Sequence, residues 1–542
     1  MGGSDKPRRS FDLDEPVEFD EAITLTGYGR FHYESLVVCA ICVLTVGFQN
    51  GITSYIFPAA QCELNLESSQ LGFLNVAFLV GGMCSSFFWG ILADGSGRRK
   101  VLIASLLLNS MSTIVLSVSN HVMCLTICRF LNGFLVGAPG TVIFSYLGEL
   151  QPPKLRSGII CGAAVFFTSS WLLLPILAWL ILPLNINLTI GSWFIISPWR
   201  LYMIFLAIPE ALVGVWFIRL PESPKYLLAK GRNQEALDIL KKMFASNERK
   251  DPDDFPVKLL YSDVAVQSNG YGQKESEKKF SRLLGEMWFQ IKNLFKTPLL
   301  FVTFLTCTIM FTNMFGVFGL GLWLPELFIR FQEYADIYPN ETVSLEKLTL
   351  LTIVKNQTCD STFDLSVIQN TVAMGITSLI TSVFSGYIST KVSIKVIPFV
   401  CMLSGGITSL SIYWLKSATQ NLIVACIFQA AMIVGNMSLS GVVVELFPTN
   451  VGAMAMCLAM FMGRMGAMTS NVVFGLLMDN HCEIPIFAVA VNVLFGAMLC
   501  LIIPTSQSKT SKSTNSYREG RTVEISLVSL PYNDKTKNTN VI

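Results

Sequence analysis

Charged residues are scarce in this sequence. Only 14% of its 542 residues are Asp, Glu, Lys or Arg and 52% are hydrophobic, whereas roughly a quarter of an average soluble domain is charged. A chain of this length with a water-facing surface needs more charge, so the composition argues against a soluble globular protein. The formal net charge is +2 and no basic stripe follows a helical face, which argues against nucleic acid as a partner.

The residue groups that mark enzymes and metal sites are also missing. The sequence has three histidines, His32, His121 and His481, and no recognisable nucleophile with its base, metal-ligand cluster or phosphate-binding loop. Its fourteen cysteines lie mostly in apolar blocks, where cysteine is usually a small buried hydrophobe. We therefore expect a protein that is not an enzyme and that holds neither a cofactor nor a metal.

The sequence does contain a series of apolar blocks, each of about twenty residues, which is enough to cross roughly 30 Å of hydrocarbon as a helix. Six blocks precede a polar connector at 220–297 and six follow it. We predict an all-α membrane protein with twelve transmembrane helices in two pseudo-symmetric six-helix bundles, at 35–219 and 298–503. The predicted spans are 35–58, 69–93, 101–119, 122–147, 157–183, 199–219, 298–325, 366–390, 394–415, 420–446, 451–478 and 484–503.

Both ends of the chain are polar. The first 34 residues are acidic and lack the pattern of a signal peptide, so the first span is expected to be an uncleaved anchor. The last segment, 504–542, is rich in Ser, Thr, Lys and Asn. We predict that both ends are disordered and cytoplasmic.

The distribution of positive charge predicts the orientation. Lys and Arg gather in the loops that contain Arg98–Lys100, Lys154 and Lys391, and are absent from the opposite loops at 59–68, 183–198 and 479–483. The basic side is therefore predicted to face the cytoplasm, in the plasma membrane or an intracellular vesicle membrane. N-glycosylation sequons should then lie on the other side, as those at Asn187, Asn340 and Asn356 do.

The two halves carry corresponding landmarks. Gly386 follows Gly90 by 296 residues, and Glu445, in Glu-Leu-Phe-Pro, follows Glu149, in Glu-Leu-Gln-Pro, by the same offset. Two landmarks at one offset indicate duplication of a six-helix unit. Such repeats place a solute site near the bilayer midplane, between halves that move against each other.

A second feature is the loop Gly90-Ile-Leu-Ala-Asp94-Gly-Ser-Gly97-Arg98-Arg99-Lys100. A positive-inside anchor explains its basic residues but not Asp94 before a glycine-bearing turn. The loop resembles the signature G-x-L-A-D-R-x-G-R-R/K of the major facilitator superfamily, with Gly95 where that pattern usually has Arg. The resemblance implies that the Asp pairs with nearby basic residues and with a helix N-terminus of the other half, so that the cytoplasmic side stays closed when the transporter faces outward.

Further matches follow in the expected order. They are Arg129-x-x-x-Gly133, Glu149 with Arg156, and Pro221-Glu222-Ser223-Pro224. The sequence of these motifs is most similar to the synaptic-vesicle glycoprotein, organic cation/anion transporter and sugar porter branch of the superfamily. The loop predicted at 326–365 is too short for the large luminal domain of the vesicle glycoproteins, and Gly452 replaces a usual Arg. The gating residues implied by the resemblance are Asp94, Arg98, Arg99, Arg129, Glu149, Arg156, Glu222 and Glu445.

The first span contains Gln49 and Asn50 where those relatives tend to carry carboxylates. Proton-coupled carriers commonly use a buried carboxylate, and none is evident near a mid-span position, since the depth of Glu210 beside Pro209 is uncertain from sequence. A uniporter or exchanger is therefore predicted. The candidate cavity residues are the polar or aromatic side chains at helix middles: Gln49, Asn50, Asn75, Phe167, Asn313, Phe318, Gln429, Asn436 and Ser440. None of them is charged, so the sequence predicts no preference for a charged solute.

For each of these candidates, hydrogen bonding between helices is an equally good interpretation. The predicted function is transmembrane transport of a small organic solute by alternating access, by a chain that acts as a monomer. The alternative is a transport-inactive binding protein or receptor of vesicle membranes with the same fold.

Overall fold

The computed structural model describes residues 16–504 except 65, 185–187, 191–193, 262–284, 286–288, 290, 298, 339–364, 389–391, 393–394, 416, 448 and 480. The helices belong to one unit of the chain, which ends at Ile502. The three predicted glycosylation sites, Asn187, Asn340 and Asn356, and the tail from residue 505 onwards lie outside the described residues.

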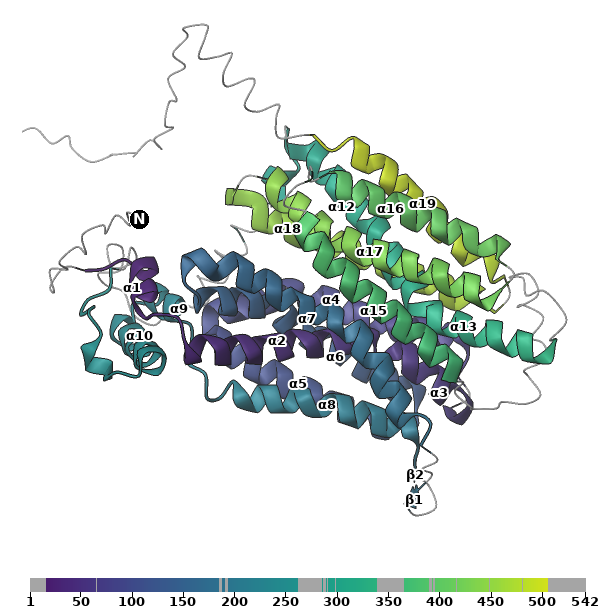
Figure 1. The fold of residues 1–542 in the computed structure, drawn as a ribbon, viewed down its shortest axis with the longest axis horizontal. Helices are drawn as coiled ribbons and strands as arrows, with labels where there is room; N and C mark the ends of the chain where they lie inside the picture. The colour runs from purple at the N-terminus through teal and green to yellow at the C-terminus, as the bar shows by residue number, and fades with distance from the viewer. Residues whose placement is uncertain are drawn as a thin grey trace, which may run out of the picture. The chain divides into compact units, whose positions relative to one another are not determined.

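Six long helices form the first bundle, drawn from purple to blue in Figure 1. Proline begins two of them, at Pro153 and Pro198, where its fixed φ suits the first helical position. Gly97 separates two others with φ +106°, a conformation that favours glycine. The helices are α2 (Arg30–Gly51), α4 (Ser68–Ser96), α5 (Arg98–Val118), α6 (Val122–Glu149), α7 (Pro153–Ile181) and α8 (Pro198–Trp216).

The second bundle also has six long helices, drawn from teal to yellow in Figure 1. They are α12 (Leu299–Phe318), α15 (Leu365–Ile388), α16 (Val396–Ser411), α17 (Ala418–Leu446), α18 (Thr449–Leu477) and α19 (Glu483–Leu501). The landmarks of the repeat occupy equivalent places: Glu149 ends α6 and Glu445 lies next to the last residue of α17.

Two helices extend predicted spans. After Ile52, α3 (Thr53–Leu64) continues the first span, and after Gly319, α13 (Leu320–Ile337) continues the seventh. The prediction of a loop from residue 326 was wrong, because Arg330 and Glu326, which suggested a polar loop, form an ion pair within α13.

The outer surfaces are apolar, as a lipid-facing surface requires. Exposed examples are Leu108 and Met111 on α5, Phe304 on α12 and Val491 on α19. Among the described residues, ten helical segments are long and apolar enough to cross a membrane, or eleven if the two parts of α4, bent by 45°, count as one span. The remaining long helix, α18, includes Arg464.

Short elements lie outside the spans. The strands β1 (Leu188–Ile190) and β2 (Phe194–Ile196) pair antiparallel before α8. From the connector, α9 (Pro224–Ala229) and α10 (Asn233–Glu248) share an apolar core with α1 (Phe19–Leu25), and Phe255, directly after the 3₁₀ turn η1 (Pro252–Asp254), also contributes to it. A second 3₁₀ turn, η3 (Ile412–Trp414), follows α16. The prediction that the whole start of the chain is disordered was therefore wrong for residues 16–29, because α1 buries Ala22 and Ile23 in this core.

The bundles are in close contact in the half of the molecule that contains Asp479, and we call its outer end the Asp479 end. A side chain at Gly72 of α4 would lie 2.8 Å from the Cα of Gly475 in α18, and one at Gly375 of α15 would lie 2.6 Å from the backbone of Leu172 in α7. The other end of the bundles, where α4 meets α5, is called the Arg98 end below. Glycine thus permits backbone-to-backbone contact at the Asp479 end.

Candidate functional site

Two small adjoining cavities lie between the bundles and share Ser54. One is lined by Asn75 and Leu71 from the first bundle and Trp323 and Glu326 from α13. The other is lined on the first-bundle side by Tyr55 and Trp171, and on the second by Gly321, Thr371 and Gln429. Each has room for about one water molecule. We call the set Ser54, Asn75, Trp171, Thr371 and Gln429 the inter-bundle site.

Two residues of this site, Gln429 and Ser54, have buried side-chain polar atoms that make no hydrogen bond, and Gln429 has two such atoms. Its side chain is 2% exposed, and neither its amide oxygen nor its amide nitrogen makes a hydrogen bond. Gly321 faces it so closely that any side chain there would come within 2.8 Å of Oε1. A buried, unsatisfied amide is costly, and a polar group that entered the cavity would reduce this cost.

A second polar group lies inside the first bundle. The amide of Gln49 donates to Thr113 Oγ1 at 3.0 Å and to Glu210 Oε2 at 3.1 Å, while Asn109 donates to Glu210 Oε1 at 2.6 Å. Glu210 is 1% exposed. The prediction that no carboxylate lies deep in a span was therefore wrong, because Pro209 lies inside α8 and does not end the helix.

The interior also contains positive charge. Arg129 of α6 is 2% exposed and places its guanidinium 4.4 Å from the centre of the Phe78 ring. Arg464 of α18 lies so close to Gly82 of α4 that any side chain at Gly82 would come within 2.1 Å of Nη1. The sequence motif marked Arg129 as a gating residue, and no sequence pattern marked Arg464, so the set of predicted cavity residues contained neither of these charges.

The other predicted cavity residues are divided between the bundles. Asn75 accepts a hydrogen bond from Thr53 at 2.7 Å, and Asn50 bonds to the carbonyl of Val46 in its own helix. Phe167 packs in the apolar core of the first bundle.

In the second bundle, Asn313 Nδ2 donates to Asn436 Oδ1 at 3.3 Å, and the hydroxyl of Ser440 donates to the backbone carbonyl of Asn436. Phe318 is half-buried at the end of α12, where its carbonyl accepts from Asn471. The structure thus brings Asn75 and Gln429 to the inter-bundle site and places the remaining candidates in or against one bundle.

The predicted gating residues other than Arg129 lie at the Arg98 end. Arg98 Nε lies 2.9 Å from Glu149 and Arg98 Nη2 lies 3.4 Å from Asp94. The backbone nitrogen of Arg99 donates to Glu222, and Ser223 donates to Glu149.

The outer members of this group have different neighbours. Arg156 pairs with Asp20 of α1 at 3.0 Å, and Glu445 is exposed at the end of α17. Tyr226 donates to the carbonyl of Gly95; burial, and after it the charge of Glu222, raises the pKa of this tyrosine. The contacts of Arg98, Arg99 and Arg156 lie within the first bundle, the connector and the N-terminal segment.

Two polar clusters at the Asp479 end were not predicted. Arg330 bonds to Glu326 at 3.0 Å, to Asp479 at 2.8 Å and to Ser68 at 3.2 Å. Arg200 pairs with Glu63 at 2.7 Å, and Glu63 also accepts from Trp199 and Ser197. The signal for the first cluster was the four-residue spacing of Glu326 and Arg330, which puts both on one helical face.

Comparison with known proteins identifies the family. The model of the Major Facilitator Superfamily matches residues 39–471. The chain belongs to this superfamily. Synaptic vesicle glycoprotein 2A of Rattus norvegicus is 25% identical over 373 residues, which cover 66% of this facilitator-superfamily chain and 50% of the relative. Synaptic vesicle glycoprotein 2C of Mus musculus is 26% identical over 61% of this chain and 48% of its own length. The chain thus spans about half the length of these curated relatives.

Solved structures agree with the fold. The xylose transporter XylE from E. coli, in a partially occluded inward open conformation, superposes with a TM-score of 0.61 at 16% identity, covering 88% of this chain and 99% of the other. A structure described as a D-xylose-proton symporter gives the same score. Together with the family match, this confirms the predicted family and the twelve-helix, two-bundle fold class.

Proposed function

We propose that this chain transports a small organic solute across a membrane by alternating access between its two bundles. The observation that carries the proposal is the unpartnered amide of Gln429, buried between the bundles beside the Trp171 ring. Each cavity now has room for about one water molecule, so a solute with a hydrogen-bonding group and a compact apolar body would pair with the amide and pack on the ring once the bundles move apart. The bundles are joined by side-chain bonds on one side of this site, at the Asp479 end.

The roles of the charged residues follow from this proposal. Asp94, Arg98, Arg99, Arg129, Glu149, Arg156, Glu222 and Glu445 would serve gating, as the family resemblance implies. In the present arrangement, Arg98 and Arg99 hold the first bundle and the connector together, and hydrogen bonds from Ser68 and Arg330 join the two bundles at the Asp479 end.

A two-stage experiment tests the proposal. Solutes are first selected by the rise in melting temperature that they give the purified protein, since a ligand that binds the native state stabilises it by mass action. Their exchange is then measured in proteoliposomes. Gln429→Ala should lower the exchange rate at low solute concentration by at least about tenfold, the equivalent of one lost hydrogen bond with its desolvation. Ser438→Ala in the same helix, whose hydroxyl bonds to its own helix at Val434, is the matched control.

The outcomes separate the alternatives. Exchange that depends on Gln429 supports transport. Stabilisation by a solute without any exchange would support the transport-inactive binding protein instead. Exchange that is unchanged in Gln429→Ala would remove Gln429 from the solute site.

We further propose uniport or exchange without proton coupling. This proposal is supported by the uncharged Gln49 in the first span and by the position of Glu210, which bonds to Gln49 and Asn109 inside the first bundle and does not line the inter-bundle site. Exchange should therefore persist when the pH gradient is abolished with the membrane potential clamped. Collapse of exchange under these conditions would contradict this part of the proposal.

The orientation and the membrane are also proposals. We propose that the Arg98 end and both termini face the cytoplasm, and that the membrane is that of a vesicle, as in the names of the curated relatives. Asn187, Asn340 and Asn356 should then carry glycans. Substitution of each by Gln should shift the electrophoretic mobility of the protein in the same way as glycosidase treatment.

A further inference from the structure

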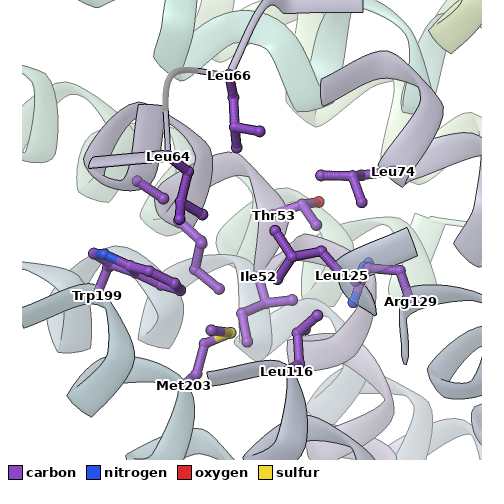
Figure 2. A pocket seen from close by; sticks show the side chains of 12 residues that line it. Ile52, Thr53, Leu64, Leu66, Leu74, Leu116, Leu125, Arg129, Trp199 and Met203 are labelled. Atoms are coloured by element: carbon purple, nitrogen blue, oxygen red, sulfur yellow. The ribbon is translucent and has the colours of Figure 1, made fainter. Parts of the chain in front are cut away.

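An apolar pocket lies within the first bundle, apart from the inter-bundle site. Figure 2 shows it between Trp199 and Arg129, with apolar side chains around the space between them. The surface that the pocket exposes is apolar, so it offers no hydrogen-bonding group to a ligand. The interior of the Arg98 end is different, because a histidine is buried there among polar groups.

This histidine, His32, lies in the first turn of α2, before the span predicted at 35–58, and is 0% exposed. Its ring stacks on the Tyr28 ring, with 4.7 Å between the ring centres, and meets the Phe31 ring edge-on. Its Nε2 atom is buried and makes no hydrogen bond, and its Nδ1 atom lies 3.0 Å from Nδ2 of Asn247 in α10. A titratable side chain is thus enclosed where the first span meets the connector.

The amide of Asn247 is held by the backbone that leads into α2. Its oxygen accepts from the N–H of Phe31 at 3.1 Å, and its nitrogen donates to the carbonyls of Thr26 at 3.1 Å and Gly27 at 3.3 Å. These bonds determine which end of the amide faces His32. Because the donor end faces Nδ1, Nδ1 has to be the acceptor, and the imidazole carries its single proton on Nε2. His32 is therefore neutral in this arrangement.

No ion pair in the described part of the chain joins His32 to a carboxylate. On the elements around it, Glu18 and Glu21 are exposed, and the remaining acidic side chains have other partners, namely Asp20 with Arg156, Glu34 with Trp216, Glu149 with Arg98 and Glu248 with Lys250. The same elements also carry Tyr28, Tyr33, Arg30 and Arg249, and these residue types supply no negative charge near neutral pH. A proton on His32 would thus add a buried positive charge that has no partner.

We propose that His32 is a pH-sensitive latch, in which protonation of the imidazole breaks its contact with Asn247 and releases the N-terminal segment, residues 16–29, from α10. A protonated Nδ1 would point its N–H at the N–H groups of Asn247, and two donors repel each other. Turning the amide over would remove this conflict, but it would give up the bonds to Phe31, Thr26 and Gly27. Either response loosens the hold of the connector on this segment.

The direction of the pH dependence follows from the neutral docked state. In the released segment, the imidazole is in water and titrates in the ordinary range of histidine, near pH 6.5. A group that binds a proton only in the released state weakens docking as the pH falls below this range, by at most about tenfold for each pH unit. Above this range, docking should not change with pH.

Release would also reach the predicted gating residues. Asp20 of α1 pairs with Arg156 at 3.0 Å, and α1 buries Ala22 and Ile23 in the core that it shares with α9 and α10. When residues 16–29 leave, Arg156 loses its acidic partner. The latch therefore links the pH on the Arg98 side to a residue of the gating group, whichever solute the protein carries.

Hydrogen–deuterium exchange of the purified full-length protein tests the latch without reference to transport. Peptides that cover residues 19–27 report the opening of the N-terminal segment, once the known pH dependence of chemical exchange is divided out. Protection of these amides in the wild type should fall by about tenfold between about pH 7.5 and about pH 5.5. Protection of the α17 amides should stay the same.

Three variants separate the latch from other effects of acid. His32→Asn puts an oxygen acceptor close to the position of Nδ1 and cannot titrate, so it should keep full protection at both pH values. Asn247→Ala removes the contact and should give low protection at both. The matched control is His121→Asn, which replaces an exposed histidine before α6 and should show the same pH dependence as the wild type.

The proposal is overturned if protection in the wild type is equal at the two pH values, or if it falls to the same extent in His32→Asn. If His32→Asn does not fold, Asn247→Ala decides the question, because a fall in protection on acidification that persists in this variant would place the pH sensor elsewhere.

Discussion

Ser68 at the start of α4 donates a hydrogen bond to Asp479, 2.7 Å away, although 411 positions separate the two residues in the sequence. Arg330 of α13 reaches both of them. The three side chains join the first bundle to the second at the Asp479 end. If the two bundles move apart at this end, this contact has to break. The strength of the contact should therefore determine the population of the form in which the Asp479 end is open.

Asp479→Asn should therefore favour opening of the Asp479 end. The substitution keeps the shape of the side chain but removes the charge that Arg330 pairs with. Loss of a hydrogen bond to a charged group costs about 1.5–3 kcal/mol, which would raise the population of the open form by about tenfold or more. The measurement is the rate at which a membrane-impermeant maleimide, added at the Asp479 end, modifies Ser54→Cys in the inter-bundle site. Glu63→Gln, which removes a charge at the same end but within one bundle, is the control, and equal rates in the two variants would contradict the prediction.

Glu63 should make stability depend on acidic pH. Burial acts to raise the pKa of this carboxyl, but hydrogen bonds from Ser197, Arg200 and Trp199 together with the Arg200 charge outweigh burial and lower it. A carboxyl whose pKa is lower in the folded state contributes stability above its unfolded pKa, and this contribution is lost as the pH falls through the folded pKa. The melting temperature of the wild type should thus decrease when the pH falls below the usual pKa range of a glutamate. The melting temperature of Glu63→Gln should be lower at neutral pH and should change less on acidification. Parallel pH profiles for the two proteins would contradict this.

The spans and the repeat could be predicted because hydropathy and motif spacing are local properties of the sequence. The extension of α13 could not, since Glu326 and Arg330 suggest a polar loop unless their partner Asp479 is known. The ordered segment around α1 was missed for a related reason. A helix of seven residues is not stable alone, and its core with α9 and α10 comes from residues some 200 positions away.

The candidate site was predicted only by residue type. Gln49 and Gln429 are both glutamines in apolar blocks, yet Gln49 bonds to Glu210 and Thr113 whereas Gln429 has no partner. Which amide nitrogen finds an acceptor depends on neighbours that are distant in sequence, so no local pattern distinguishes the two glutamines. The depth of Glu210 is a similar case, because a proline next to it is compatible with both a helix end and a helix interior in a membrane.

Gly72 should tolerate no side chain, although alanine is normally the better helix former by about 1 kcal/mol. A Cβ at Gly72 would meet the Cα of Gly475 and the carbonyl of Asn471, and overpacking of this kind costs about 1–3 kcal/mol. Gly72→Ala should lower the melting temperature. Gly90→Ala in the same helix, where nothing lies within 4 Å of the added carbon, should leave it unchanged or raise it. Similar effects of both substitutions would show that α4 and α18 do not pack closely at Gly72.

Arg98 has two acidic neighbours that should differ in energy. Its Nε lies 2.9 Å from Glu149, and both side chains are mostly buried, whereas Asp94 is 3.4 Å away with 61% of its side chain exposed. Exposed pairs contribute about 0.2–1 kcal/mol, while side chains within a shared network couple by up to about 3 kcal/mol. A double-mutant cycle of Arg98→Gln with Glu149→Gln should therefore give a clearly larger coupling than a cycle of Arg98→Gln with Asp94→Asn, measured from unfolding in detergent. Equal couplings would contradict this prediction and would mean that the signature aspartate contributes as much as Glu149 in this conformation.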